Sequence, residues 1–271
     1  MSEAAGFLFD VDGTLVLGSG PAGEGATVLP SAVEAVAHLR ERGIPVAFCT
    51  NGSNRTPAQI AANLRSVGID ADPERCFTPV AVAARLIARD VPDARVFVLG
   101  DEAARRPLLE AGLEVVAGEH ADRANVLLVA HDKHIDAAKL DRAANALWRG
   151  AAFYVTATAP FYATRAGRAL GLSALVGMGL AHVSGVTPTV TGKPSPAVME
   201  MAAEMLGVEV ADMAVVGDDI GAEVGMARAT GAVSVLVLTG TAKRADLDAL
   251  APDAAPDVVV KTLEDLMEQL P

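Results

Sequence analysis

The sequence is poor in cysteine, aromatic residues and positive charge. Its two cysteines, Cys49 and Cys76, stand in different contexts and form no CxxC pair, which argues against a disulfide framework or a zinc site. Only 4% of the 271 residues are aromatic, so the apolar share of 51% comes mainly from Ala, Val and Leu. This composition is typical of helices packed against a buried sheet.

Basic residues number 22 against 34 acidic ones, and the formal net charge is -12. Such a surface repels phosphate backbones, so we expect no nucleic-acid partner, and a small anionic substrate needs a local positive site. Residues 170–186 carry no formal charge, but His182 and several Gly favour a buried helix over a membrane span. Since no basic flank and no long apolar region follow Met1, we expect a cytoplasmic protein without a membrane partner.

Short apolar runs alternate with helical patterns along the chain. This alternation predicts an α/β fold with a doubly wound, Rossmann-like parallel sheet. The predicted strands are at residues 6–9, 45–49, 96–99, 126–129, 153–155, 213–216, 233–238 and 258–260. Helices are predicted over residues 30–42, 56–67, 195–206 and 220–230. We expect a catalytic core formed by residues 1–78 and 188–271, and an inserted α/β domain formed by residues 79–187.

Two carboxylates, Asp10 and Asp12, directly follow the first predicted strand. Open α/β sheets bind ligands at this end of their strands. Alternate residues of a strand share a face, so both carboxylates can point at one ligand while Gly13 lets the chain turn away. They would repel each other unless a cation or a shared proton intervened. Taken alone, an Asp-Gly turn that merely ends a strand is the commoner explanation.

Polar residues recur at comparable places further along the chain. Thr50-Asn51-Gly52 follows the second predicted strand, Gly217-Asp218-Asp219 ends the strand at 213–216, and Thr191-Gly192-Lys193 precedes a helix. Each motif alone is common as a turn, a helix cap or a surface lysine. Their occurrence together and in this order favours a functional site.

The motifs Asp10-Val11-Asp12-Gly13-Thr14, Thr50-Asn51, Lys193, and Gly217-Asp218-Asp219 with Glu223 resemble, in order, the four motifs of the haloacid dehalogenase superfamily of phosphohydrolases. The insertion between the second and third motifs is similar to that of the C2-capped branch, subfamily IIA, which contains 4-nitrophenylphosphatase-like enzymes. The resemblance covers the whole chain. It implies a phosphoric monoester hydrolase with a C2-type cap, acting on a small phosphorylated metabolite, and it suggests a homodimer formed through the cap.

Chemical roles follow from the residue types and from this resemblance. Asp10 is the expected nucleophile and Asp12 the acid–base partner. Anions crowded around a phosphate demand a hard cation such as Mg²⁺; the resemblance implies that Asp10 and Asp218 bind it through their side chains and Asp12 through its carbonyl. Asp219 and Glu223 are expected to support metal-bound waters and Lys193, although many relatives carry Asp in place of Glu223. The expected phosphate-binding residues are Val11, Thr50, Asn51, Gly52 and Lys193.

Three functional classes stay open: a phosphomonoesterase, a phosphotransferase or phosphomutase with the same aspartyl chemistry, and a catalytically silent phosphate-binding protein. A dehalogenase is disfavoured because it would not need Asp12. Residues 18–23 match GxGxxG, but they open no helix and Pro21 removes an amide, which argues against a dinucleotide site. Residues 18–25 are expected to form a mobile flap by the active site, with a plain surface loop as the alternative. His131 and His134 are three residues apart and have no further ligands at a suitable spacing, so we expect them to lie in a surface loop and not in a metal site.

The loop expected to face the phosphate from the inserted domain reads Thr158-Ala159-Pro160-Phe161, where relatives often have Thr-Asn-Pro-Asp. The change removes an amide and a carboxylate and adds an aromatic surface. We therefore expect substrate selectivity to depend on shape and apolar contact. The candidates for contact with the leaving group are Phe161, Tyr162, Arg165 and Arg168.

Overall fold

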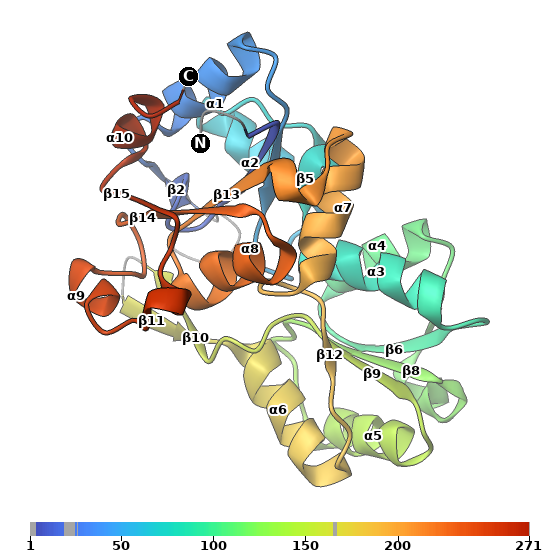
Figure 1. Ribbon diagram of the computed structural model, residues 1–271. Helices are drawn as coiled ribbons and strands as arrows, with labels where there is room; N and C mark the ends of the chain where they lie inside the picture. The colour runs from blue at the N-terminus through green and yellow to red at the C-terminus, as the bar shows by residue number, and fades with distance from the viewer. Residues whose placement is uncertain (1–3, 19–24, 26, 165–166, 271) are drawn as a thin grey trace.

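The computed structural model describes residues 4–18, 25, 27–164 and 167–270, and two parallel sheets dominate this part of the chain (Figure 1). The strand order is β15-β14-β13-β1-β4-β5 in the first sheet and β12-β9-β8-β6-β7 in the second. Strand pairs within both sheets are parallel. The predicted fold class, α/β with a Rossmann-like core, is confirmed.

The first sheet consists of β1 (Gly6–Asp10), β4 (Val46–Cys49), β5 (Cys76–Phe77), β13 (Met213–Gly217), β14 (Val233–Val237) and β15 (Val258–Val260). Helices cover both faces of this sheet. Successive side chains of the central strand β1 point to opposite faces, and each face packs against its own set of helices. Phe7 and Phe9 pack with α1 (Ala32–Glu41), α2 (Pro57–Ser66) and α10 (Leu263–Met267). Leu8 packs on the opposite side with α3 (Pro79–Asp90), α7 (Pro196–Leu206) and α8 (Gly225–Thr230).

The second sheet consists of β6 (Arg95–Leu99), β7 (Glu114–Val116), β8 (Val126–Val129), β9 (Ala152–Val155) and β12 (Thr189–Val190). One face packs against α5 (Ala137–Trp148) and α6 (Leu172–Ser184), and the other belongs to the apolar cluster of α3 and α4 (Glu102–Glu110). That cluster also contains Leu8 of the first sheet, so the two sheets share one core through α3 (Figure 1). The expected division of the chain into a core and an inserted domain of residues 79–187 stays a prediction. Strand β12 of the second sheet lies just beyond the expected end of the inserted domain.

Most predicted elements agree with the structure within one or two residues, and the exceptions have local causes. The helix expected over 220–230 is a π-helical turn, Ile220–Val224, followed by α8, whose last residue is Thr230 and whose C-cap is Gly231 with a φ of 76°. Two hairpins had no counterpart in the prediction. They are β2 (Val16–Leu17) with β3 (Thr27–Val28), and β10 (Phe161–Thr164) with β11 (Gly167–Leu170).

The uncharged segment 170–186 forms α6, but only one face of this helix is buried. Leu175, Met178 and Val183 are exposed on the other face, so the prediction of a buried helix is wrong for that face. No helix among the described residues has the length and apolarity needed to cross a membrane. The homodimer through the cap stays a prediction.

Candidate active site

The predicted site residues meet at the carboxyl edge of the first sheet. β1 ends at Asp10, β4 is followed by Thr50, and β13 is followed by Asp218. These strands are neighbours and run parallel, so their ends lie side by side around a cavity of about 140 Å³. The cavity is lined by the following predicted residues: Asp10, Asp12, Thr50, Asn51, Gly52, Lys193, Asp218, Asp219 and Glu223.

Val11 is the exception among the expected phosphate-binding residues. Its side chain is buried in the apolar core, and its main-chain N–H donates to the carbonyl of Cys49 at 3.1 Å. The structure therefore does not bring Val11 to the cavity wall.

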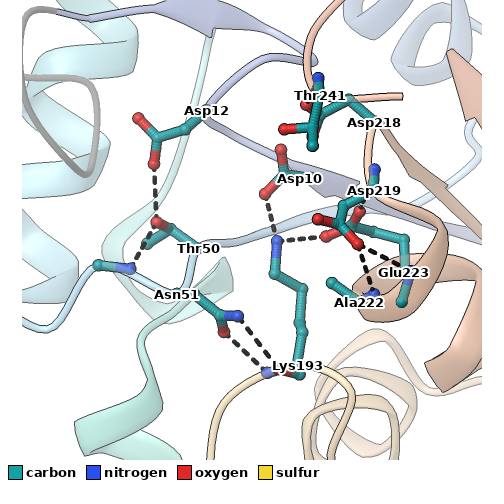
Figure 2. A network of polar contacts seen from close by, with 12 residues as sticks. Asp10, Asp12, Thr50, Asn51, Lys193, Asp218, Asp219, Ala222, Glu223 and Thr241 are labelled. Carbon is teal, nitrogen blue, oxygen red and sulfur yellow. Dashed lines mark hydrogen bonds and ion pairs between the residues drawn. The ribbon is translucent and has the colours of Figure 1, made fainter. Parts of the chain in front are cut away.

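Lys193 joins two buried carboxylates. Its ammonium group forms ion pairs with Asp10 Oδ1 and, at 2.6 Å, with Glu223 Oε1 (Figure 2). The other oxygen of Asp10, Oδ2, is buried and has no hydrogen-bond partner among the described residues. Asp10 thus presents one neutralised oxygen and one unpartnered oxygen.

Asp12 lies beside this cluster and contacts a different residue. The Thr50 hydroxyl donates to Asp12 Oδ2 at 2.9 Å, and the same hydroxyl oxygen accepts from the N–H of Gly52 at 2.9 Å (Figure 2). Thr50 is buried, so this short chain of hydrogen bonds fixes the orientation of the Asp12 carboxylate. The two first-motif carboxylates consequently have separate partners.

The Asn51 side chain binds the main chain of Lys193. Its Oδ1 accepts from the N–H of Lys193 at 2.8 Å, and its Nδ2 donates to the carbonyl of Lys193 at 3.1 Å. Both polar ends of the amide are used, so the side chain of Asn51 positions Lys193 instead of facing a phosphate in this structure. Sequence spacing gave no indication of this pairing across 142 positions.

Asp218 is held by tight main-chain packing. Its Oδ2 accepts from the N–H of Thr241 at 2.5 Å. A Cβ atom added to Gly240 would lie 1.9 Å from this oxygen, and one added to Gly13, whose φ is 95°, would lie 2.4 Å from it. Only glycine lets the two loops approach the carboxylate this closely.

Asp219 and Glu223 have different partners. Asp219 caps the π-helical turn, since its Oδ1 accepts from the N–H groups of Gly221 and Ala222 at 2.7 and 3.0 Å. Glu223 accepts from the N–H of Asp219 at 2.9 Å through Oε2 and contacts Lys193 through Oε1. The longer side chain of Glu223 therefore reaches Lys193 from within the turn.

Burial and mutual repulsion raise the pKa values of the acidic cluster. Burial raises the pKa of Asp10 to about 7, against the opposing effect of Lys193, and the Asp218 and Asp12 charges add to the increase. Burial and the Glu223 charge raise the pKa of Asp218 to about 6, and burial raises the pKa of Glu223 to about 7. Although burial acts to lower the pKa of Lys193, the adjacent Asp10 charge holds it well above its usual value. Excess negative charge of this kind is characteristic of a cation site.

The residues present fit a hard divalent cation. Asp10 and Asp218 supply carboxylate oxygens, and the two residues lie near enough for the Asp218 charge to raise the pKa of Asp10. No group of three or more His, Cys, Asp or Glu side chains in the described part of the chain is arranged to hold a metal ion. The expected ligand set needs only two carboxylates, because Asp12 would contribute its carbonyl oxygen.

The second sheet and its hairpin supply the outer wall of the cavity. Phe161 and Tyr162 line it, as expected, and the exposed Arg168 stacks on Phe161 with its guanidinium 4.1 Å from the ring centroid. Arg165, and all of segment 18–25 except Gly18 and Gly25, lie outside the described residues.

Sequence reasoning missed several polar residues of the wall. They are Ser53, Asn54, His131 and Ser173. His131 lies in a loop, as expected, but it is partly buried at the cavity, whereas His134 is exposed. The only available signal was the position of His131 just after a predicted strand of the inserted domain.

Comparison with known proteins places the chain in a family. A model described as haloacid dehalogenase-like hydrolase matches residues 7–114, and a related hydrolase model matches residues 190–266. A 5′-nucleotidase of Bacillus subtilis is 34% identical over 244 residues, which cover 90% of this chain and 91% of the relative. An acid sugar phosphatase of Staphylococcus aureus is 31% identical over 218 residues, 80% of each chain. The chain belongs to the haloacid dehalogenase-like hydrolases.

The solved structures that resemble this chain include phosphatases. A p-nitrophenyl phosphatase from Archaeoglobus fulgidus has a TM-score of 0.87 and 33% identity, over 99% of this chain and 100% of that one. A glycerol phosphate phosphatase from Mycobacterium tuberculosis, in complex with magnesium, has a TM-score of 0.86 and 29% identity, over 97% of this chain and 77% of that one. The resemblance to 4-nitrophenylphosphatase-like enzymes is confirmed, as is the prediction of a phosphoric monoester hydrolase.

Proposed function

We propose that this chain is a magnesium-dependent phosphatase that hydrolyses small phosphate monoesters through an aspartyl-phosphate on Asp10. The observation that supports this most directly is the state of the Asp10 carboxylate. Lys193 neutralises Oδ1, while Oδ2 is buried at the cavity without a hydrogen-bond partner among the described residues. An oxygen of this kind is available to form a bond with phosphorus.

In the first half of the reaction, Asp10 Oδ2 bonds to phosphorus and the bond from phosphorus to the ester oxygen breaks. Asp12 gives its proton to the departing alkoxide, and the Thr50 hydroxyl holds its carboxyl in place. In the second half, Asp12 removes a proton from water, the water oxygen attacks phosphorus, and the bond to Asp10 breaks. Lys193 neutralises part of the charge on the transferring group throughout.

Mg²⁺ would be held by the carboxylate oxygen of Asp10 that does not attack phosphorus, by the side chain of Asp218 and by the carbonyl of Asp12. When bound, it would offset the repulsion between the carboxylates and the phosphate and polarise a phosphoryl oxygen. The raised pKa values of Asp10 and Asp218 and the magnesium complex of a similar phosphatase support this assignment.

The test combines kinetics with trapping of the intermediate. We expect Asp10→Asn to lower phosphate release from 4-nitrophenyl phosphate by at least about a thousandfold, while the exposed control Asp248→Asn retains wild-type rates. Acid quenching followed by mass spectrometry should find phosphate on the peptide that contains Asp10. EDTA should abolish turnover and added Mg²⁺ should restore it.

Activity of Asp10→Asn within tenfold of wild type would contradict the nucleophile assignment. Transfer of the phosphate to an added alcohol in preference to water would favour a phosphotransferase instead.

A further inference from the structure

Two polar atoms at the cavity are buried and have no hydrogen-bond partner in the described part of the chain. They are Nε2 of His131 and Oδ1 of Asn54, and both residues line the same cavity as Asp10. Leaving a buried polar atom without a partner lowers stability, and folded proteins rarely do so. Two such atoms on residues that line one cavity therefore point to a ligand group that satisfies both.

The main chain holds these two residues together across the junction between the sheets. The N–H of His131 donates to Ser53 Oγ at 2.9 Å, and Ser53 directly precedes Asn54. The carbonyl of His131 accepts from the N–H of Asp101 at 3.0 Å. His131 comes from the segment just after β8, and Asn54 from the short segment between β4 and α2, so both residues are anchored by regular elements of the two sheets, which suits them to recognition.

The chemistry of the two atoms selects the group that they would bind. Asn54 Oδ1 can only accept a hydrogen bond, so the ligand must donate to it, which a carboxylate or a second phosphate dianion cannot do. Burial lowers the pKa of His131, so its ring is neutral at neutral pH and Nε2 either donates or accepts. A hydroxyl group meets both requirements, because it donates one hydrogen bond and accepts others.

We propose that Asn54 and His131 bind a hydroxyl group of the alcohol part of the substrate, which makes monophosphates of small polyhydroxylated alcohols the preferred substrate class. This inference rests on the proposed phosphatase function. It differs from the expectation that selectivity depends on shape and apolar contact, since Phe161 supplies an apolar wall while the polar contacts come from other segments.

The experiment compares two substrates that differ only in hydroxyl groups, glycerol 3-phosphate and propyl phosphate. Wild type should prefer glycerol 3-phosphate by at least about tenfold in kcat/KM, because propyl phosphate leaves both buried atoms unsatisfied. His131→Ala and Asn54→Ala should each reduce this preference by about fivefold to tenfold. The exposed neighbour offers a matched control, and His134→Ala should keep the wild-type preference.

Two further measurements distinguish loss of the hydroxyl contact from a general loss of folding or activity. His131→Gln retains a donor and an acceptor and should recover part of the preference that His131→Ala loses. On an Asp10→Asn background, which prevents turnover, calorimetry should show weaker binding of glycerol 3-phosphate when Asn54→Ala is added. If His131→Ala fails to fold, these two variants still decide the question.

The outcomes separate this inference from the function on which it rests. A wild-type protein that hydrolyses 4-nitrophenyl phosphate but shows no preference for glycerol 3-phosphate over propyl phosphate would overturn the hydroxyl site alone. An equal loss on both substrates in the His131 and Asn54 variants would overturn it as well. A protein that hydrolyses none of these esters would overturn the phosphatase function and, with it, the inference.

Discussion

Replacing Lys193 with methionine tests the electrostatic design of the site. Lys193 lies between Asp10 and Glu223, and the exposed fractions of the three side chains are 4%, 5% and 2%. Methionine has a similar length and no charge, so it leaves two buried carboxyls without their cation. Breaking a buried ion pair in this way costs about 3–5 kcal/mol of the free energy of unfolding.

The raised pKa values determine the pH at which this cost appears. Because the pKa of Asp10 and that of Glu223 are about 7 in the folded protein, and 3.8 and 4.5 ordinarily, the folded state binds protons more tightly. The free energy of unfolding therefore falls as the pH rises above the ordinary pKa values of the two carboxyls. In wild type this fall ends near pH 7, where both carboxyls have lost their protons in the folded state as well. Without Lys193 the pKa values of Asp10 and Glu223 rise further, so the free energy of unfolding continues to fall above pH 7. At about 1.4 kcal/mol per pH unit for each carboxyl, this fall reaches about 4 kcal/mol over about 1.5 units above neutrality.

The assay is urea unfolding of the metal-free protein, followed by far-ultraviolet circular dichroism. We expect Lys193→Met to be close to wild type near about pH 5.5 and about 3–5 kcal/mol less stable near about pH 8.5. Arg106→Met is the control, because Arg106 pairs with Glu110 at the surface with exposed fractions of 66% and 65%, and it should change stability by less than about 1 kcal/mol at either pH. An equal loss at both pH values would refute the electrostatic reasoning and attribute the effect to packing.

Three further predictions concern neighbouring residues. Asp12→Asn should slow hydrolysis of an alkyl phosphate more than that of 4-nitrophenyl phosphate, by on the order of tenfold, and equal losses would contradict the acid role. Gly240→Ala, whose Cβ would lie 1.9 Å from Asp218 Oδ2, should raise the half-activating Mg²⁺ concentration by at least about tenfold, whereas Gly179→Ala, with nothing within 4 Å, should not. Asn51→Ala should lower kcat by about tenfold to a hundredfold with little change in KM, since it releases the main chain of Lys193; an unchanged kcat would argue against that positioning role.

The core of the site was predictable because buried parallel strands have a simple sequence pattern. β13 is entirely apolar up to Gly217, and the change to Asp218 marks the strand end directly. The same change occurs after β1 and β4. Since neighbouring parallel strands end at one edge, the three strand ends had to meet there. Order along the chain then identified Lys193, which no strand end marks.

Contacts that depend on the relative placement of distant segments were not predictable. The bond from His131 to Ser53 joins positions 78 apart, and neither residue has a local pattern that indicates a partner. Short elements such as β5 and β12 contain two residues each, too few for any periodicity. The place of His131 at the cavity could not be predicted for this reason: its hydrogen-bond partner Ser53 lies on the segment after β4, far away in the sequence.

The connections between the two sheets hold the cavity wall formed by the second sheet and the β10–β11 hairpin in place against Asp10 and Lys193. The chain crosses from the first sheet to the second near Pro79 and crosses back near Thr191. Thr191 Oγ1 donates to the carbonyl of Pro79 at 2.8 Å, so a hydrogen bond joins the two crossings. A Cβ atom added to Gly192 would lie 2.3 Å from the carbonyl oxygen of Thr156 and 2.5 Å from Asn51 Oδ1, so the crossing is packed against both sheets. Lys193 follows immediately and is held by Asn51. We expect a displacement of the second sheet at this crossing to move the main chain of Lys193 and with it the ammonium group that pairs with Asp10, which would couple the position of this wall to the reactivity of the proposed nucleophile.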